Sequence, residues 1–186
     1  MRLFVAIAIP GEIRERYAAL IGEFAAIAPQ AKWVRPENLH ITLKFLGRTP
    51  PEKLDALRQV LTEVRSPDST KLNFLGLGFF PHDRRPRVLW AGMEASANLK
   101  PLAEGVDQAA HRLGFPLEER PFTPHLTLAR FEPPGIAPEL LEAVRANSGE
   151  NFGALTATGF HLVQSKLKPG GAEYSTVQTF RFAPEG

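Results

Sequence analysis

The sequence predicts an α+β fold with two similar lobes, each an antiparallel sheet flanked by helices, arranged about an approximate twofold axis with a central cleft. The first observation behind this prediction is a repeat, because His-Ile-Thr-Leu at 40–43 returns as His-Leu-Thr-Leu at 125–128. The second is that Arg-Pro at 35–36 and Arg-Pro at 120–121 precede the two copies by the same interval. The third is that helix-like and strand-like runs accompany each copy in the same order.

In the first half, apolar periodicity and turn residues define the elements. The apolar amino-terminal run ends at Pro10-Gly11, and the helical stripe that follows ends at Pro29. The two strands after the second helix are connected by a tip with two prolines and three charges, which is typical of a hairpin. The expected elements are a strand at 2–9, a helix at 12–28, the first motif strand at about 39–46, a helix after Pro51, and strands at 71–80 and 87–93.

The second half repeats this order. Gly114 ends its first helix, and Lys168-Pro169-Gly170-Gly171 connects its last two strands as a hairpin turn. We expect residues 1–186 to form one domain of two intertwined lobes, each carrying one motif. The expected elements are a helix at 98–113, the second motif strand at about 125–131, a helix at 138–146, and strands at about 155–167 and 173–182.

Composition limits the function classes. The net charge of +2 arises from 22 basic and 20 acidic residues, so attraction for nucleic acid must be local. The absence of cysteine excludes a disulfide framework, a zinc finger and a thiol nucleophile. The apolar start is too short and too soon followed by charge for a signal peptide, and no run approaches ~18 apolar residues. We therefore expect a soluble, cytoplasmic protein.

The two motifs carry side chains suited to phosphodiester chemistry. Residues i and i+2 of a strand share a face, so His40 and Thr42 point the same way, roughly 6.7 Å apart along the strand, as do His125 and Thr127. Two histidines across a cleft can divide acid and base duties near neutral pH. Two threonine hydroxyls can donate to the oxygens of a phosphate as charge builds on them. This arrangement needs no metal or other cofactor.

Other catalytic signatures are absent from the sequence. It contains no phosphate-binding loop, no G-x-G-x-x-G motif after a strand, no H-E-x-x-H and no G-x-S-x-G. The sequence therefore does not support binding of a nucleoside triphosphate, a dinucleotide or zinc, or the chemistry of a serine hydrolase. Gly76-Leu77-Gly78 is only a weak fragment of a glycine-rich loop.

The paired His-x-Thr-x motifs resemble those of the 2H phosphoesterases, specifically the RNA 2′,3′-cyclic phosphodiesterases that are also called 2′-5′ RNA ligases. The likeness covers nearly the whole chain, including the start at 2–7, the approach at 34–39 and the closing hairpin at 162–182. It implies hydrolysis of an RNA-terminal 2′,3′-cyclic phosphate to a 2′-phosphate, with ATP-independent ligation as the reverse reaction. It also implies that His40 is the proton donor and His125 the proton acceptor, with Thr42 and Thr127 holding the phosphate.

Three further residues are candidates for substrate binding. Arg130 could bind phosphate bidentately, but strict alternation puts it on the face opposite His125, so this role requires a bulge or a strand end. Lys44 is expected on the His40 face, as the basic residue of the first motif. Phe45 could stack a base at the cleft rim, although alternation favours core packing for it. Trp33 and Trp90 are expected in the core.

We expect the partners to be RNA with 2′,3′-cyclic phosphate ends or small cyclic-phosphate nucleotides, bound by a monomer without a metal or a membrane. Two alternatives stay open. One is a cyclic phosphodiesterase that acts on small nucleotides or ADP-ribose derivatives at the same site. The other is a noncatalytic RNA-binding module, which predicts salt-sensitive binding without turnover.

Overall fold

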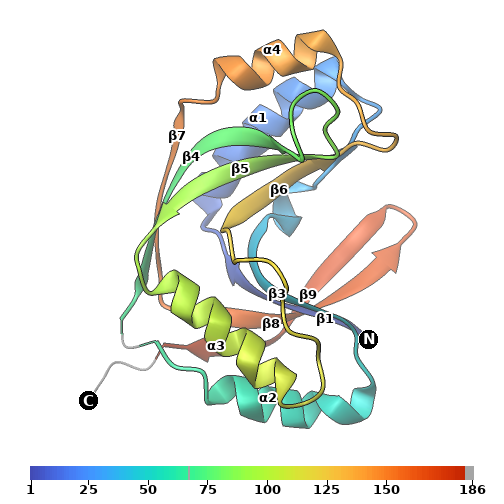
Figure 1. The fold of residues 1–186 in the computed structure, drawn as a ribbon. Coiled ribbons are helices and arrows are strands. Elements are labelled where there is room, and N and C mark those ends of the chain that lie inside the picture. Colours follow the sequence, from blue (N-terminus) through green and yellow to red (C-terminus); the bar gives the residue numbers. More distant parts are fainter. Residues whose placement is uncertain (67, 183–186) are drawn as a thin grey trace.

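The computed structural model of the chain (Figure 1) describes residues 1–66 and 68–182 and confirms the α+β class. It has a four-stranded sheet in the order β3-β1-β8-β9 and a five-stranded sheet in the order β2-β6-β5-β4-β7, and every strand pair is antiparallel. The strands are β1 (Arg2–Ala8), β2 (Lys32–Trp33), β3 (His40–Arg48), β4 (Thr70–Phe80), β5 (Val88–Ala95), β6 (His125–Arg130), β7 (Asn151–Ala157), β8 (Gly159–Lys168) and β9 (Gly171–Arg181).

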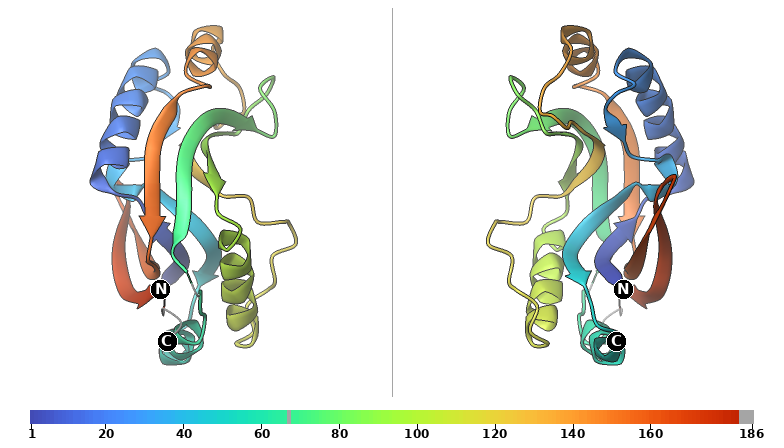
Figure 2. Two further views of the ribbon diagram at one scale, coloured as in Figure 1. Left: turned by 90° about the vertical axis from the view of Figure 1, so that its left-hand side faces the viewer. Right: turned by 90° about the vertical axis from the view of Figure 1, so that its right-hand side faces the viewer.

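The helices cover the two sheets in pairs (Figures 1 and 2). They are α1 (Gly11–Ile27), α2 (Leu54–Thr62), α3 (Leu99–His111) and α4 (Pro138–Ala146), with short 3-10 turns η1 (Pro36–Asn38) and η2 (Pro51–Lys53). The first helix packs on α4 and β7, whereas α2 packs on α3 and β9. Each sheet therefore takes one helix from each half of the chain.

The predicted strand at 155–167 is wrong, because the chain changes sheets within it. Residues up to Ala157 belong to β7 and pair with β4, whereas residues from Gly159 belong to β8 and pair with β1. Only Thr158 separates β7 from β8, so the sequence shows no turn at the crossing. Glycine is needed at 159, because a Cβ there would lie 2.5 Å from the carbonyl oxygen of Phe180.

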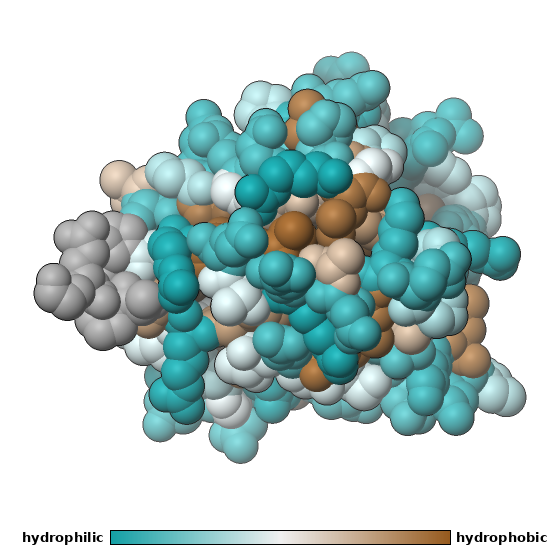
Figure 3. Space-filling view, turned by 90° about the horizontal axis from the view of Figure 1, so that it is seen from below, coloured by the Kyte–Doolittle hydropathy of each residue, from teal (hydrophilic) through white to brown (hydrophobic). Residues whose placement is uncertain are grey.

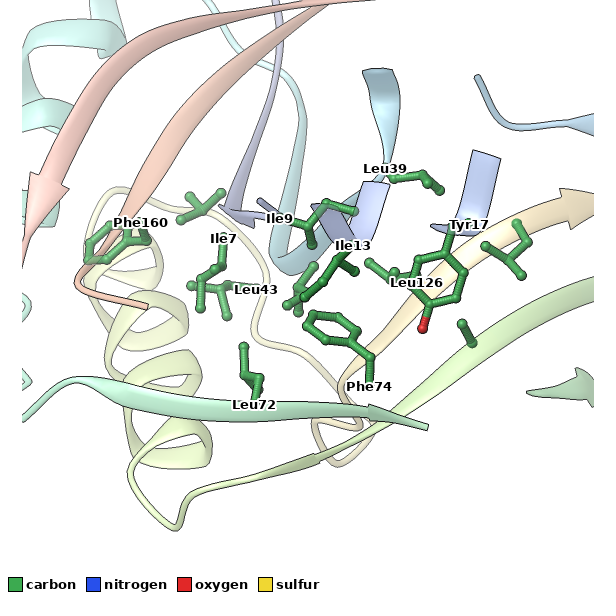
Figure 4. Close-up of a cluster of buried hydrophobic side chains, with 14 of the residues drawn as sticks. Ile7, Ile9, Ile13, Tyr17, Leu39, Leu43, Leu72, Phe74, Leu126 and Phe160 are labelled. Carbon is green, nitrogen blue, oxygen red and sulfur yellow. The ribbon is translucent and has the colours of Figure 1, made fainter. Parts of the chain in front are cut away.

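One apolar core joins the two lobes. Figure 4 shows side chains of both sheets in contact within it, including Ile7 of β1, Leu43 of β3, Leu72 of β4 and Leu126 of β6. These four residues are each at most 4% exposed. Because the motif leucines and isoleucine face this core, the histidines and threonines of the same strands point to the opposite face.

The face on the side of α2 and α3 is mostly polar (Figure 3). Seen from the side of α2 and α3, hydrophilic side chains cover most of the face and hydrophobic ones gather near its middle (Figure 3). None of the helices within residues 1–66 and 68–182 combines the length and hydropathy needed to span a membrane.

Candidate active site

The two motif strands lie next to each other although they belong to different sheets. Strand β3 contacts β6, and each strand begins at its motif histidine. The charge of His125 acts on the His40 ring and lowers its pKa, so the two side chains are electrostatic neighbours. The structure thus brings the two histidines together from positions 85 residues apart in the chain.

Both imidazole rings are oriented by the same hydrogen bond. The Nδ1 atom of His40 lies 2.6 Å from the carbonyl oxygen of Asn38, and Nδ1 of His125 lies 2.9 Å from that of Thr123. A carbonyl oxygen only accepts, so each Nδ1 carries a proton. Each Nε2 atom is left free to accept a proton from, or to donate one to, a reacting group.

The approach to His40 is itself held by the last hairpin. The Asn38 amide donates to the carbonyl oxygen of Ala172 at 2.8 Å, while the carbonyl of the same residue accepts from His40. Asn38 is a buried polar residue, 8% exposed. The turn between β8 and β9 therefore helps to fix the orientation of the first catalytic candidate.

The two histidines have different surroundings. His40 stacks on Phe4, with ring centroids 4.6 Å apart, and meets the edge of Tyr174 at 5.3 Å. Burial lowers the pKa of His40, the hydrogen bond to Asn38 opposes this shift, and the charge of His125 adds to it. His125 is exposed. The neutral form of His40 is consequently favoured in the free protein.

A bulge in β3 overturns two predictions. Lys44 pairs with Val5 and Thr42 pairs with Ala6, so Leu43 has no partner on β1. Such an extra residue reverses the alternation of the side chains that follow it. The bulge moves Lys44 to the core side and Phe45 to the side of His40, opposite to what strict alternation predicts.

Lys44 is a buried residue that forms an ion pair within the protein. Its side chain is 1% exposed and its ammonium group donates to Asp107 at 2.6 Å and to the Pro116 carbonyl at 2.8 Å. Glu118 lies 3.6 Å away and donates its backbone N–H to the Asp107 carboxylate. The prediction that Lys44 lies on the His40 face is wrong, because a carboxylate 63 residues away in α3 compensates its burial.

Phe45 lies at the rim of the site and not in the core. It is 63% exposed, pairs directly with Phe4 across the strands, and its ring centroid is 6.3 Å from the ring of Phe4. Because Phe4 stacks on His40, Phe45 is one ring removed from the imidazole. The core packing favoured by alternation is therefore wrong, and the stacking position considered for Phe45 is available.

Strand β6 has the same irregularity at the equivalent leucine. Thr127 pairs with Trp90 and Ala129 pairs with Leu89, so Leu128 has no partner on β5. This bulge places Arg130 on the face of His125 and Thr127, as a substrate role for Arg130 requires. Its charge acts on Tyr174 of the opposite sheet and opposes the burial that raises the pKa of that phenol.

The two halves of the site are thus related residue by residue. In each strand, the histidine and the threonine two positions later point into the site and are followed by a bulge at leucine. Five positions after the histidine, the first strand carries Phe45 and the second carries Arg130. Thr42 and Thr127 are both half-buried, and neither hydroxyl is bonded to another of the described residues.

Sequence reasoning missed three aromatic residues of the site. Phe4 and Tyr174 enclose His40, yet both lie in strands without a motif. Trp33 packs against the core as predicted, but Trp90 does not belong to the core and stands beside Thr127. The cross-strand position of Trp90 depends on register, which the sequence does not reveal.

No cluster of metal-ligand type forms here. Within residues 1–66 and 68–182, no three His, Asp or Glu side chains converge as a metal site would require. The polar groups that the register of β3 and β6 puts on the faces of the motif histidines are imidazoles, hydroxyls and one guanidinium, which suit a phosphate anion.

Comparison with known proteins identifies the family. A family described as "LigT like Phosphoesterase" matches residues 7–90 and 93–174. The chain belongs to this family. The resemblance of the paired His-x-Thr-x motifs to the 2H phosphoesterases is thereby confirmed.

Relatives of this LigT-like phosphoesterase match it over their full length. A protein of Archaeoglobus fulgidus named RNA 2′,3′-cyclic phosphodiesterase is 38% identical over 97% of this chain and 99% of its own. A crystal structure of a Thermus thermophilus protein, TT0787, aligns with a TM-score of 0.79 and 34% identity over the whole of both chains. E. coli LigT complexed with 3′-AMP aligns with a TM-score of 0.76 and 32% identity over 97% of each chain.

Proposed function

We propose that this protein is an RNA 2′,3′-cyclic phosphodiesterase that opens the terminal cyclic phosphate to a 2′-phosphate by acid–base catalysis without a metal. The observation that carries the proposal is the pair of neighbouring histidines whose Nδ1 atoms are both bound to backbone carbonyls. Two fixed imidazoles with free Nε2 atoms supply the base and the acid that hydrolysis of a phosphodiester requires. Family membership and the names of its relatives support the substrate class.

The proposed reaction includes two proton transfers, one from water to a histidine and one from the other histidine to the leaving oxygen. His125 removes a proton from water, and the oxygen of that water forms a bond to phosphorus. The bond between phosphorus and the 3′ oxygen breaks, and His40 donates its proton to that oxygen. The products are a 3′-hydroxyl and a 2′-phosphate. If a 5′-hydroxyl attacks phosphorus in the place of water, the same bond to the 3′ oxygen breaks and the product is a 2′-5′ phosphodiester, which is ATP-independent ligation.

The surroundings of His40 bear on this division of roles. Burial lowers its pKa in the free protein, which by itself favours a base in this position and opposes the donor role. A phosphodiester carries a negative charge, and an anion beside an imidazole raises its pKa. The donor role that the family resemblance implies for His40 therefore depends on the bound substrate, whereas His125 is exposed and accessible to water.

The other residues of the site would bind the phosphate and the nucleoside. Thr42 and Thr127 present unbonded hydroxyls from both sheets and can donate to the non-bridging oxygens. Arg130 adds a guanidinium on the same face and can bind a phosphate oxygen pair. Phe45 offers an exposed ring at the rim of the site, on which the base of an adjoining nucleotide can stack.

Replacement of each histidine tests the proposal. We expect His40→Ala and His125→Ala to abolish opening of a nucleoside 2′,3′-cyclic phosphate while the thermal unfolding temperature stays near that of the native protein. His111→Ala is the matched control, because this exposed histidine lies on α3, where its Nδ1 atom is 3.0 Å from the Phe115 carbonyl oxygen. Full activity in either motif variant would refute the acid–base pair, and binding without turnover by the native protein would favour the noncatalytic alternative.

A chelator tests metal independence separately. EDTA is expected to leave the rate unchanged, since the proposed acid and base are both side chains of this chain. Loss of the rate with EDTA, and its recovery with a divalent cation, would contradict this part of the proposal. Comparison of RNA oligomers with mononucleotides and ADP-ribose cyclic phosphates would distinguish the substrate alternatives.

A further inference from the structure

Trp90 occupies an unusual position for a large aromatic residue. It lies on β5 directly opposite Thr127, so the two side chains share the face of the five-stranded sheet that carries His125. The neighbouring residues Leu89 and Ala91 are fully buried in the core, whereas Trp90 is only half-buried and does not pack against that core. Its indole therefore lies on the same face of the sheet as His125 and Thr127.

Two glycines hold the indole down on the sheet. A Cβ atom at Gly78, the residue opposite on β4, would lie 2.1 Å from Cζ2 and 2.5 Å from Cη2 of Trp90. A Cβ atom at Gly92, two residues along β5, would lie 3.1 Å from Cζ3. The six-membered ring thus occupies the space above both glycines. This explains Gly78, which the sequence presents only as part of a weak glycine fragment.

No aromatic ring, cation or hydrogen-bond acceptor in the described part of the chain pairs with the indole of Trp90. Trp90 forms no aromatic pair and no cation–π contact with residues 1–66 or 68–182, and its Nε1 donates to none of their acceptors. Trp33, in contrast, donates to the Ala28 carbonyl at 2.8 Å and lies 6.3 Å from the ring of Phe24. The indole of Trp90 therefore lies beside Thr127, and no aromatic ring or cation of the described residues stacks on it.

We propose that Trp90 is the stacking platform for the nucleobase of the nucleotide whose phosphate is bound by Thr127. Adjacent strands are about 4.8 Å apart, so an indole that extends from β5 towards β4 lies between about 5 and 10 Å from the strand of Thr127. A ribose fills the space between a phosphate and its base. Stacking on an aromatic face accepts every base, so this platform would distinguish nucleosides from sugars without choosing among bases.

The proposal rests on the proposed function, since it assigns a ligand group at the same site. It names Trp90 as a substrate-binding residue whose contact is equal in the ground state and the transition state. Loss of such a contact raises KM and leaves kcat unchanged. The rise in KM must therefore depend on the presence of the base and not on the phosphate.

Fluorescence can isolate this residue, because the chain has two tryptophans. In Trp33→Phe, Trp90 becomes the only indole, and stacking of a base should quench its emission. The probes are adenosine 3′-monophosphate, ribose 5-phosphate and inorganic phosphate, each titrated to saturation of the site as judged by inhibition. Quenching by the nucleotide alone is expected; equal responses to all three probes, or no response to the nucleotide, would overturn the proposal.

Kinetics provide the second readout. For Trp90→Leu, we expect KM for adenosine 2′,3′-cyclic phosphate to rise about tenfold or more, with kcat unchanged. KM for methyl ribofuranoside 2′,3′-cyclic phosphate, which has no base, should not change. Gly78→Ala, which must displace the indole, should reproduce this pattern, and Trp90→Phe should recover part of the affinity. Equal effects on both substrates would refute the stacking role.

These outcomes separate the inference from the proposed function. If the native protein opens neither substrate, the proposed function fails. If it opens both and the Trp90 variants have native KM values, only the platform fails. Thermal unfolding of each variant shows whether a loss of activity reflects a loss of fold.

Discussion

Replacement of Lys44 by methionine is predicted to destabilise the fold without weakening substrate binding. Methionine fills a similar volume but cannot donate to Asp107 or to the Pro116 carbonyl, at 2.6 and 2.8 Å. The Lys44 side chain is 1% exposed and the Asp107 side chain 15%, so the carboxylate would remain largely desolvated without a counter-ion. Removal of one partner from a buried ion pair costs about 3–5 kcal/mol.

The lower end of this range applies here, because Asp107 keeps some solvent contact and the backbone N–H of Glu118 at 3.2 Å. A loss of about 3 kcal/mol corresponds to a fall of about 6–12 °C in the unfolding temperature for a domain of this size. Thermal unfolding followed by circular dichroism measures this change. Steady-state kinetics on a cyclic phosphate at low temperature should give a native KM.

Two further variants make the prediction specific. Lys32→Met is the matched control, because this lysine pairs with Glu132 while 67% exposed, and loss of an exposed pair costs at most about 1 kcal/mol. Lys44→Met combined with Asp107→Leu should recover much of the lost stability, since no buried charge is left unpaired. A Lys44→Met protein with native stability and a raised KM would show that Lys44 binds substrate and would refute the reasoning.

Three other predictions concern stability and binding. Burial holds the pKa of His40 below 6.5 in the folded protein. Between that lowered value and 6.5, the unfolded chain therefore binds more protons than the folded protein. The free energy of unfolding should consequently fall as the pH decreases through this window. His40→Gln should flatten this slope in thermal unfolding, and an unchanged slope would contradict the shift. Tyr17→Phe should raise the unfolding free energy by about 1 kcal/mol in urea titrations, because the buried Tyr17 hydroxyl has no partner among the described residues; a loss of stability would show that the hydroxyl is satisfied. Arg130→Ala should lower kcat/KM about 10- to 100-fold, with Arg130→Lys in between, and native kinetics in both would place Arg130 outside the site.

The sequence was sufficient for the helices, for most of the strands and for the two strands that carry the proposed site. The two His-x-Thr-x copies could be recognised because identical spacing in two strands implies identical orientation, and the structure packs β3, which carries His40, against β6, which carries His125. The helical spacing of apolar residues predicted each of the four helices α1 to α4. It could not show that α1 packs with α4 on the five-stranded sheet, because an apolar stripe reveals a buried face and not its partner.

The errors share one physical origin. Alternation predicts side-chain direction only while strand pairing stays regular, and both motif strands contain a bulge at leucine. One extra residue in each strand reverses the side-chain directions that follow it, those of Lys44 and Phe45 in β3 and that of Arg130 in β6. Nothing local marks the bulge in β3, since the stabilising partner of Lys44 is Asp107 in a distant helix. The crossing between sheets before Gly159 was hidden because only one residue, Thr158, separates β7 from β8.

The central claim is that His40 and His125 act on one phosphate, and a crystal structure with bound inorganic phosphate tests it most directly. The account predicts that the Nε2 atoms of both rings lie within about 2.6–3.2 Å of oxygens of the same anion, with the hydroxyls of Thr42 and Thr127 also in contact. A phosphate that contacts one histidine while the other points elsewhere would contradict the account.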